Sequence, residues 1–301
     1  MDVAARFAQG LVLDGGLAFE LERRGADLRD ELWSARILLE QPDLIREVHA
    51  AYFAAGAEVA ITASYQASYE GFAQRGLDRA SSDRLLTRSV ELAREAAAGD
   101  QLVAASVGPY GAMLADGSEY VGRYGRSVRE LVEWHRPRLE ALLGAGPDLL
   151  AVETIPAIEE VEAIVTLLET YPEARAWISC SCRDETHLSD GTPFADAAAL
   201  AASSPQVVAV GVNCTPPGFV SDLLRSAARV PAPLLTYPNL GSTWDAAAKT
   251  WRAEGPRPDF GALAVGWREA GATAIGGCCG TDPDDVAAIA RSLAPRSDRR
   301  R

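Results

Sequence analysis

The sequence contains no uninterrupted apolar stretch of the roughly 18 to 20 residues that a membrane-spanning helix needs. Its first residues, MDVAARFAQG, include an early acidic residue and no long apolar segment, so we expect no secretion signal and a cytoplasmic location. Basic residues are the minority charge, because 29 Lys and Arg stand against 42 Asp and Glu and leave a formal net charge of −13. Nucleic-acid phosphates and anionic lipid repel such a chain, and we expect neither as a partner.

Motifs for nucleotide binding and for hydrolysis by a serine nucleophile are also missing. The sequence has no P-loop, no Gly-x-Gly-x-x-Gly that follows an apolar run into a helix, and no nucleophile elbow. Nucleotide cofactors and Ser-His-Asp hydrolysis therefore have no support. The histidines are His49, His135 and His187, which fall within predicted helices or in a polar loop, so we expect them to be structural or solvated and not metal ligands.

The composition is that of a globular protein, with 48% hydrophobic and 24% charged residues in a chain of 301. Eight short apolar runs rich in β-branched residues predict eight strands, and apolar residues at helical spacing predict helices between most of them. The predicted strands are 11–14, 58–63, 102–107, 149–153, 176–180, 207–212, 234–237 and 272–276. The predicted helices are 42–55, 83–98, 127–143, 157–170, 194–203, 218–228, 258–270 and 283–293.

Nearly continuous apolar strands that alternate with helices predict a parallel sheet covered by helices. Eight such units in this length fit a single α/β domain, a (β/α)8 barrel of the TIM type, over residues 1–295. An open, doubly wound sheet is the alternative architecture. Residues 296–301, RSDRRR, are expected to form a disordered and solvated basic tail.

The unusual residues of the sequence follow the apolar runs directly. Because the carboxyl ends of the strands meet at one rim of a parallel barrel, where active sites of this architecture lie, one pocket can collect all of these residues. They are Asp14-Gly15-Gly16, residues 62–66, Gly108-Pro109-Tyr110, Glu153-Thr154, residues 181–183, Asn213-Cys214-Thr215, Tyr237-Pro238-Asn239 and residues 276–280.

The cysteines are the first candidates for chemistry. There are five, an odd number, and Cys278 and Cys279 are badly placed to bridge each other, so in a reducing compartment they indicate metal or catalytic chemistry. Together with Cys214 they supply three thiolates, which suits a catalytic zinc site with an open fourth position. The alternative is that free cysteines are buried as small hydrophobic residues. We favour that interpretation for Cys180, and both remain open for Cys182.

Two acidic residues at the predicted rim also invite a functional interpretation. Asp14-Gly15 is either an ordinary β-turn or a site where the carboxylate and a backbone amide bind the charged groups of an amino acid. Glu153 ends an apolar run, where burial without a partner is costly. Its partner is either a cationic ligand group or an internal arginine, and its position alone does not decide between them.

Taken together, the motifs resemble those of the homocysteine S-methyltransferase family. The resemblance runs from about residue 12 to residue 290, and its most specific part is GVNC followed by GGCCG, with DGG preceding both. The similar stretches are 12–25 (VLDGGLAFELERRG), 61–76 (ITASYQASYEGFAQRG), 106–124 (SVGPYGAMLADGSEYVGRY), 151–156 (AVETIP), 188–194 (LSDGTPF), 210–217 (VGVNCTPP), 237–245 (YPNLGSTWD) and 275–286 (IGGCCGTDPDDV).

The resemblance implies a (β/α)8 barrel in which Cys214, Cys278 and Cys279 hold one Zn2+ and the sulfur of L-homocysteine enters as a further ligand. It also implies a set of residues around the substrate: Asp14, Gly15, Thr62 and Glu153 hold the amino-acid end, and Asn213 belongs to this set and supports the metal loop. Methyl transfer to homocysteine gives methionine. The expected partners are the small-molecule substrates, L-homocysteine and a sulfonium methyl donor, with no nucleic acid and no membrane, and we expect a monomer or a small homo-oligomer.

The methyl donor is less well defined than the acceptor. The TASYQA form of the second motif and the short length are similar to members that use a sulfonium donor, S-methylmethionine or S-adenosylmethionine. Leu240 departs from the small polar residue expected in YPNLG. The alternatives are betaine as donor, selenocysteine or another small thiol as acceptor, or a non-catalytic redox sensor in which three cysteines hold the zinc. The aromatic candidates for contact with a cationic donor are Tyr65, Tyr110, Trp134 and Trp244, each of which could equally be ordinary packing.

Overall fold

The protein is a TIM barrel, as the strand and helix pattern predicts, and the open doubly wound sheet is excluded. The computed structural model describes residues 2–28, 34–241, 243–245, 250–252 and 256–294. The predicted tail at 296–301 lies outside these residues. Within them, no helix is long and apolar enough to cross a membrane.

Eight parallel strands form the barrel, in the order β1-β10-β7-β6-β5-β4-β3-β2. Backbone contacts between the two end strands close it: Leu13 bridges Val59 in parallel, and the Glu58 N–H donates to the Val12 carbonyl at 2.8 Å. All eight predicted strands are present. They are β1 (Leu11–Val12), β2 (Val59–Ile61), β3 (Leu102–Val107), β4 (Leu149–Ile155), β5 (Ala176–Cys180), β6 (Val207–Asn213), β7 (Leu234–Tyr237) and β10 (Ala272–Ile275).

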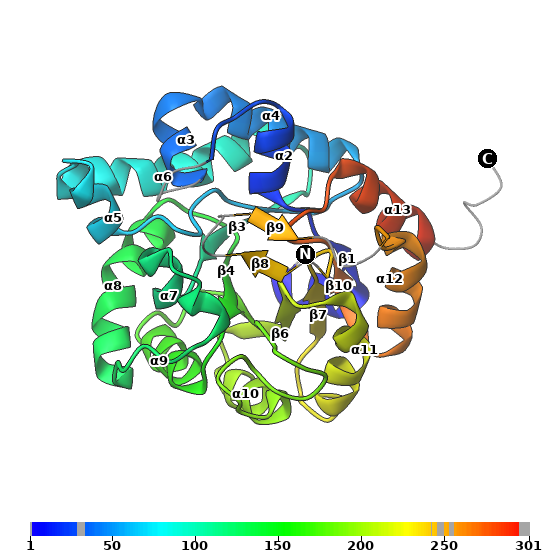
Figure 1. The fold of residues 1–301 in the computed structure, drawn as a ribbon. Coiled ribbons are helices and arrows are strands. Elements are labelled where there is room, and N and C mark those ends of the chain that lie inside the picture. The colour runs from blue at the N-terminus through cyan, green and yellow to red at the C-terminus, as the bar shows by residue number, and fades with distance from the viewer. Residues whose placement is uncertain (1, 29–33, 242, 246–249, 253–255, 295–301) are drawn as a thin grey trace.

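Helices surround the strands as an outer ring (Figure 1). The eight predicted helices correspond to α4 (Pro42–Ala54), α6 (Arg79–Ala96), α8 (Val128–Gly144), α9 (Ile158–Leu168), α10 (Phe194–Ala201), α11 (Pro217–Ser226), α12 (Phe260–Glu269) and α13 (Pro283–Leu293). Local sequence explains several of their starts. Ser127 and Glu130 form a capping box at α8, Asp282 and Asp285 form another at α13, and Pro42 occupies the first turn of α4.

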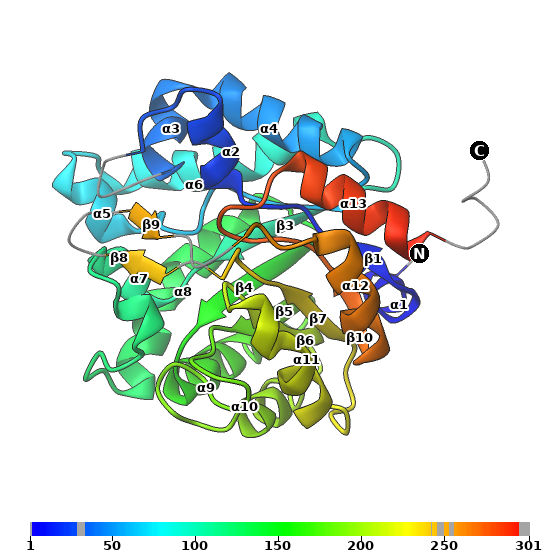
Figure 2. The ribbon, with the colours of Figure 1, turned by 45° about the vertical axis from the view of Figure 1, so that its right-hand side comes forward.

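The structure also contains elements that periodicity did not predict. Most are short helices in the connections: α1 (Val3–Gln9), α2 (Leu17–Arg23), α3 (Ser34–Glu40), α5 (Tyr69–Gln74), α7 (Tyr110–Leu114) and the 3-10 turn η1 (Ser118–Tyr120). Helices this short present too few apolar residues to give a periodic signal. The hairpin of β8 (Thr243–Asp245) and β9 (Thr250–Arg252) is the other addition. Figure 2 shows this hairpin and α1 at opposite ends of the barrel.

The hydrophobic core has two layers. One fills the barrel and includes Phe7, Leu13, Trp177 and Leu235, all fully buried. Phe7 on α1 closes the amino-terminal end, where its ring centroid lies 5.8 Å from that of Trp177. The larger layer lies between the strands and the helical ring. A barrel filled in this way leaves only its carboxyl-terminal mouth for chemistry.

His49 on α4 is a buried histidine whose burial lowers the stability of the folded protein in acid. It is fully buried, and neither ring nitrogen has a hydrogen-bond partner among the described residues. Burial lowers its pKa from 6.5 to about 4, because the charged imidazolium loses its hydration. Since the folded pKa lies below the unfolded one, the associated stability is present above pH 6.5 and is lost as the pH falls toward 4.

We therefore expect His49→Leu to stabilise the protein against unfolding, and increasingly so in acid. The difference in unfolding free energy between the variant and the wild type should be about 2 kcal/mol larger at pH 5 than at pH 7.5, as follows from the two pKa values. Urea unfolding at both pH values measures it. A difference between variant and wild type that does not change with pH would contradict this assignment.

Candidate metal and substrate site

The three cysteines lie on two loops at the carboxyl ends of β6 and β10, which are separated in the sheet only by β7. Cys214 follows the last residue of β6 and has a φ of 47°, a left-handed conformation that is uncommon outside glycine. Its backbone is held at both ends: Cys214 N–H donates to the Tyr237 carbonyl at 3.2 Å, and Asn239 Nδ2 donates to the Cys214 carbonyl at 3.1 Å. The strained backbone is thus fixed by its neighbours.

The second loop, residues 276–280 after β10, contains glycines that let it turn toward Cys214. Cys278 N–H donates to the Pro238 carbonyl at 2.9 Å, which ties the loop to the end of β7. Gly16 packs against this loop so closely that a Cβ there would lie 2.6 Å from the Cys278 carbonyl oxygen. Gly280, with a φ of 84°, completes the turn after the cysteine pair. The glycines flanking the pair permit the sharp turn that the sequence predicts.

The three thiols meet in one cluster. Cys214 Sγ lies 3.4 Å from Cys279 Sγ, Cys278 Sγ lies 4.0 Å from Cys279 Sγ, and the three sulfurs are all within 4.8 Å of one another. Tetrahedral coordination at a zinc–sulfur distance of about 2.3 Å separates two sulfur ligands by about 3.8 Å. The observed separations bracket this value, so the donor set and its spacing fit zinc with a fourth position left for another ligand.

The thiols differ in acidity because they hydrogen-bond one another. Hydrogen bonding with the Cys278 and Cys279 thiols lowers the pKa of Cys214 well below its ordinary value, with a further contribution from the Tyr120 hydroxyl. The same interaction raises the pKa values of Cys278 and Cys279. The hydrogen bonds among the three thiols thus favour a thiolate within the cluster, and the thiolate is the form that binds metal.

Asn213 connects the metal loop to two neighbouring strands. Its Oδ1 accepts from Thr154 N–H at 2.7 Å and from Ser179 Oγ at 2.9 Å, and its Nδ2 donates to Thr154 Oγ1 at 2.8 Å. Nδ2 also lies 3.9 Å from Cys278 Sγ. Thr154 has a φ of 61°, so Asn213 holds a second strained residue of the rim in place. These contacts position β4, β5 and β6 relative to the cysteine loop.

The carboxylate of Asp14 lies buried at the end of the first strand. Oδ2 accepts from Ile61 N–H at 2.8 Å, whereas Oδ1 is buried and has no partner among the described residues. Burial raises the pKa of Asp14 well above its usual range; the bond from Ile61 lowers it and the charge of Glu153 raises it further. The neighbouring Gly15 cannot carry a side chain, because a Cβ would lie 2.7 Å from the ring of Tyr52.

Glu153 is the second buried carboxylate and lies within β4. Its Oε1 accepts a hydrogen bond from Ser106 Oγ, and burial raises its pKa to about 7, against the hydrogen bonds from Ser106 and Tyr237 that lower it. None of the described groups that act on its ionisation is basic. The internal arginine considered from the sequence is therefore not its partner here. Glu153 and Asp14 together form an acidic pair without a counter-charge.

Thr62 follows β2 and is hydrogen-bonded to β3. Its Oγ1 accepts from Ser106 N–H at 3.0 Å and lies 2.8 Å from Ser64 Oγ, which itself donates to the Ser106 carbonyl at 2.8 Å. Since the Ser64 hydrogen is used, the Thr62 hydroxyl is the donor of the pair. The same donor becomes available to a ligand when the hydroxyl rotates.

The sequence did not single out Glu119 and Tyr120, although both belong to the site. They lie in η1, and the Tyr120 hydroxyl is 3.3 Å from Cys214 Sγ. Glu119 is buried, and burial raises its pKa to about 7, to which the Cys214 thiolate contributes. A 3-10 turn of three residues has no periodicity, and only the family-like stretch 106–124 contained a signal for it.

The remaining cysteines and histidines stay outside the thiol cluster. Cys180 and Cys182 are buried, and burial raises the pKa values of both thiols. His135 is buried against Glu160, with Nε2 2.8 Å from Oε1, and His187 lies on Asp184 with Nδ1 2.9 Å from Oδ1. These contacts are those of structural residues.

Two of the aromatic candidates already face arginines. The Arg126 guanidinium lies 5.3 Å from the ring centroid of Tyr110, and that of Arg138 lies 4.6 Å from Trp134. Tyr65 belongs to the site, because its buried hydroxyl is influenced by Glu119, Cys214 and Glu153, and burial raises its pKa. The side chain of Trp244 lies outside the described part of the structure.

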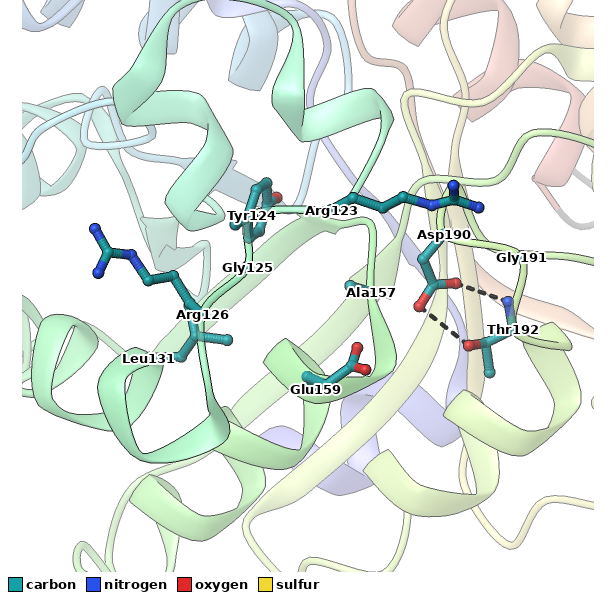
Figure 3. Close-up of a pocket in the computed structure, with 11 residues that line it drawn as sticks. Arg123, Tyr124, Gly125, Arg126, Leu131, Ala157, Glu159, Asp190, Gly191 and Thr192 are labelled. Atoms are coloured by element: carbon teal, nitrogen blue, oxygen red, sulfur yellow. Dashed lines mark hydrogen bonds between the residues drawn. The ribbon is translucent and has the colours of Figure 1, made fainter.

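A separate surface pocket lies between the segment 122–126, the start of α9 and the segment 190–192 (Figure 3). Asp190, Thr192 and Arg126 in its lining are engaged with the protein. Asp190 accepts from Thr192 N–H at 2.7 Å and from Ile158 N–H at 3.0 Å, and Arg126 points away toward Tyr110 and Glu130. No sequence-predicted site residue lines this pocket, so the thiol cluster remains the candidate centre.

Residues 11–293 match the family described as homocysteine S-methyltransferase. The chain belongs to this family. It is 53% identical to the homocysteine S-methyltransferase of Escherichia coli (strain K12), with 93% of this chain and 94% of the relative covered, and 49% identical to homocysteine S-methyltransferase YbgG of Bacillus subtilis (strain 168), with 94% and 95% covered.

The family also has solved structures with the same fold. The metallated form of the homocysteine methyltransferase MmuM from Escherichia coli is 50% identical, superposes with a TM-score of 0.85, and is matched over 94% of this chain and 96% of that chain. Its oxidized form gives a TM-score of 0.83 at 51% identity, with 93% and 95% covered. The family prediction made from the motifs is thus confirmed.

The contribution of the Asn213 hydrogen bonds to stability can be tested by mutation. Asn213→Ala leaves the buried Thr154 N–H without its acceptor, so we expect a loss of about 2 to 4 kcal/mol of unfolding free energy. Ser179→Ala removes one bond to Asn213 and the contact with the Tyr237 hydroxyl but leaves the Thr154 N–H paired, so it should cost less, about 1 kcal/mol. Urea unfolding of both variants measures these values, and equal losses would contradict the central role of Asn213.

Proposed function

We propose that this member of the family transfers a methyl group from a sulfonium donor to the sulfur of L-homocysteine, with one zinc ion held by Cys214, Cys278 and Cys279. Its family membership makes the chain a homocysteine S-methyltransferase, an enzyme that methylates homocysteine and gives methionine. The observation that supports the zinc site is that three thiols lie within 4.8 Å of one another at the barrel mouth.

The metal fits the residues that would hold it. Three thiolates are soft ligands, and the Sγ–Sγ separations of 3.4 and 4.0 Å that Cys279 makes with Cys214 and Cys278 suit tetrahedral zinc. When bound, zinc would accept the homocysteine sulfur at its open position and lower the pKa of that thiol, so that a sulfur nucleophile is available near neutral pH.

Asp14 and Glu153 would bind the α-ammonium group of homocysteine. Both are buried, both have raised pKa values, and none of the described groups that act on their ionisation is basic. An ammonium group would neutralise this acidic pair, and Asp14 Oδ1 offers an unused acceptor. The burial of two acids, which is unfavourable without a positive partner, thus becomes a recognition element.

The carboxylate end of homocysteine requires donors instead. We assign it to the Gly15 backbone N–H and to the Thr62 hydroxyl, which can turn its hydrogen from Ser64 toward the ligand. Gly15 lies between Asp14 and α2, where the ring of Tyr52 excludes any side chain. Both charged ends of the amino acid are then held beside the thiol cluster, which fixes the position of its sulfur.

The reaction needs no general acid from the protein. The leaving group of a sulfonium donor is a neutral thioether, so no proton has to reach it during transfer. This agrees with the described site, where the titratable groups are thiols, carboxylates and tyrosines and the described histidines lie elsewhere. The protein's contribution is to hold both reactants in line in a poorly hydrated pocket.

The metal assignment is tested by Cys279→Ala. We expect the variant to retain less than about one tenth of the wild-type zinc and of its methionine formation, because two thiolates bind zinc much more weakly than three. The assay uses reduced protein with homocysteine and, in parallel, S-methylmethionine, S-adenosylmethionine and betaine; a further arm replaces homocysteine with selenocysteine.

The matched control is Cys180→Ala, which removes a buried thiol that is not part of the cluster. It should keep wild-type zinc and activity. Full activity of Cys279→Ala without bound metal would refute the zinc site, and turnover with betaine alone would refute the sulfonium donor.

Glu153→Gln tests the acidic pair. The variant keeps the side-chain shape but loses the charge, so we expect the KM for homocysteine to rise about 10- to 100-fold. In the wild type, kcat/KM for homocysteine should fall as the pH is lowered through about 7, because the carboxylate must be ionised to bind a cation.

An acceptor analogue without the amino group, 4-mercaptobutanoate, provides the control. It should inhibit the wild type and Glu153→Gln equally, since it has no ammonium group that could interact with Glu153. If its inhibition weakens as much as homocysteine binding does, Glu153 acts on the site as a whole and not on the ammonium.

A further inference from the structure

Glu119 is held firmly beside the thiol cluster. Its carbonyl oxygen accepts from Ser181 Oγ at 3.2 Å, and Gly111 of α7 packs so tightly that a Cβ there would lie 2.5 Å from the Glu119 backbone nitrogen. The next residue, Tyr120, places its hydroxyl 3.3 Å from Cys214 Sγ. The backbone of η1 therefore cannot move Glu119 far from the cysteines.

The carboxylate of Glu119 has no counter-charge among the described residues. The residue is 7% exposed, and Oε2 is buried without a hydrogen-bond partner in the described part of the chain. The charged side chains that act on it are Cys214 and Asp116, both acidic. A buried acid among acids is costly unless a ligand brings a positive charge.

This acid is distinct from the pair proposed for the homocysteine ammonium. The charge of Glu153 acts on Asp14, whereas neither residue is among the groups that act on Glu119. Tyr65 is influenced by both Glu119 and Glu153 and so lies within range of both acidic positions. The site thus contains a further buried carboxylate beyond this pair, and homocysteine carries only one ammonium group.

We propose that Glu119 is the counter-charge for the sulfonium group of the methyl donor. The proposal rests on the proposed function. During transfer the bond between the methyl carbon and the donor sulfur breaks, its electron pair stays on that sulfur, and the carbon bonds to the homocysteine sulfur. The donor enters as a cation at sulfur and leaves as a neutral thioether, so Glu119 favours its entry and not its retention.

The charge change predicts which kinetic constant Glu119 controls. Positive charge on the donor sulfur declines on the way to the transition state, so a carboxylate stabilises the bound donor at least as much as the transition state. Loss of the charge should therefore raise the donor KM and leave kcat unchanged or slightly higher. A residue with a merely structural role would instead lower kcat and zinc content together.

The first experiment is steady-state kinetics of Glu119→Gln with the sulfonium donor that the wild type uses. We expect the donor KM to rise by about tenfold or more, because a buried charge pair is lost. The KM for homocysteine and the zinc content should not change. Asp116→Asn removes the same charge from an exposed position on the same loop and should change the donor KM by less than about twofold.

The second experiment measures binding of a neutral isostere. In 2-amino-5-methylhexanoate a CH group replaces the sulfonium sulfur of S-methylmethionine, while the ammonium and carboxylate groups are kept. The wild type should bind S-methylmethionine about tenfold or more tightly than this isostere, and Glu119→Gln should lose that preference. Equal weakening of both ligands would overturn the proposal, because Glu119 would then face the ammonium group.

Other outcomes are equally decisive. A raised KM for homocysteine in place of the donor would assign Glu119 to the acceptor and overturn the proposal. If Glu119→Gln does not fold, the affinity ratio between S-methylmethionine and the neutral isostere decides instead. A ratio near one in the wild type overturns the proposal. A ratio that is high in the wild type and lower in Glu119→Asp supports it. If the wild type makes no methionine from any sulfonium donor, the proposed function itself fails; if turnover persists and only the binding preference is insensitive to Glu119→Gln, the role of Glu119 alone is rejected.

Discussion

The mouth of the barrel gathers acidic groups that no described basic side chain neutralises. Three thiols lie within 4.8 Å of one another, and the carboxylates of Asp14, Glu153 and Glu119 are buried around them. Burial without counter-charge raises the pKa of each carboxylate. Such a site stores unfavourable free energy that bound cations relieve. A metal ion, an ammonium group and a sulfonium group are the three cations that the proposed reaction brings.

The barrel makes this arrangement possible because its strand ends hold the loops that carry the cysteines. Cys214 and Thr154 adopt left-handed backbone conformations that cost free energy, and both are held by hydrogen bonds that originate at the strand ends. Asn213 links three adjacent strands to the metal loop through its amide group. The backbone around Cys214 and Thr154 is therefore held by hydrogen bonds within the protein.

The strands and the longer helices could be predicted because each has a periodic pattern of its own. The predicted run 102–107 coincides with β3, and the run 176–180 with β5. The short helix α7 and the turn η1 could not, since five or three residues show no period. Glu119 was missed for the same reason. Its importance comes from burial beside Cys214, and burial in a loop depends on what packs over it.

The sequence by itself determined the order of strands and helices, the family, and which cysteines are candidates for one metal. Those features depend on local apolar spacing and on motifs of a few residues. Only the tertiary structure decided that Glu153 lacks an arginine partner, that the Thr62 hydroxyl is shared with Ser64 and Ser106, and that Glu119 has no counter-charge among the described residues. Charge compensation and hydrogen-bond pairing are set by groups far apart in the chain, so distances in space alone reveal them.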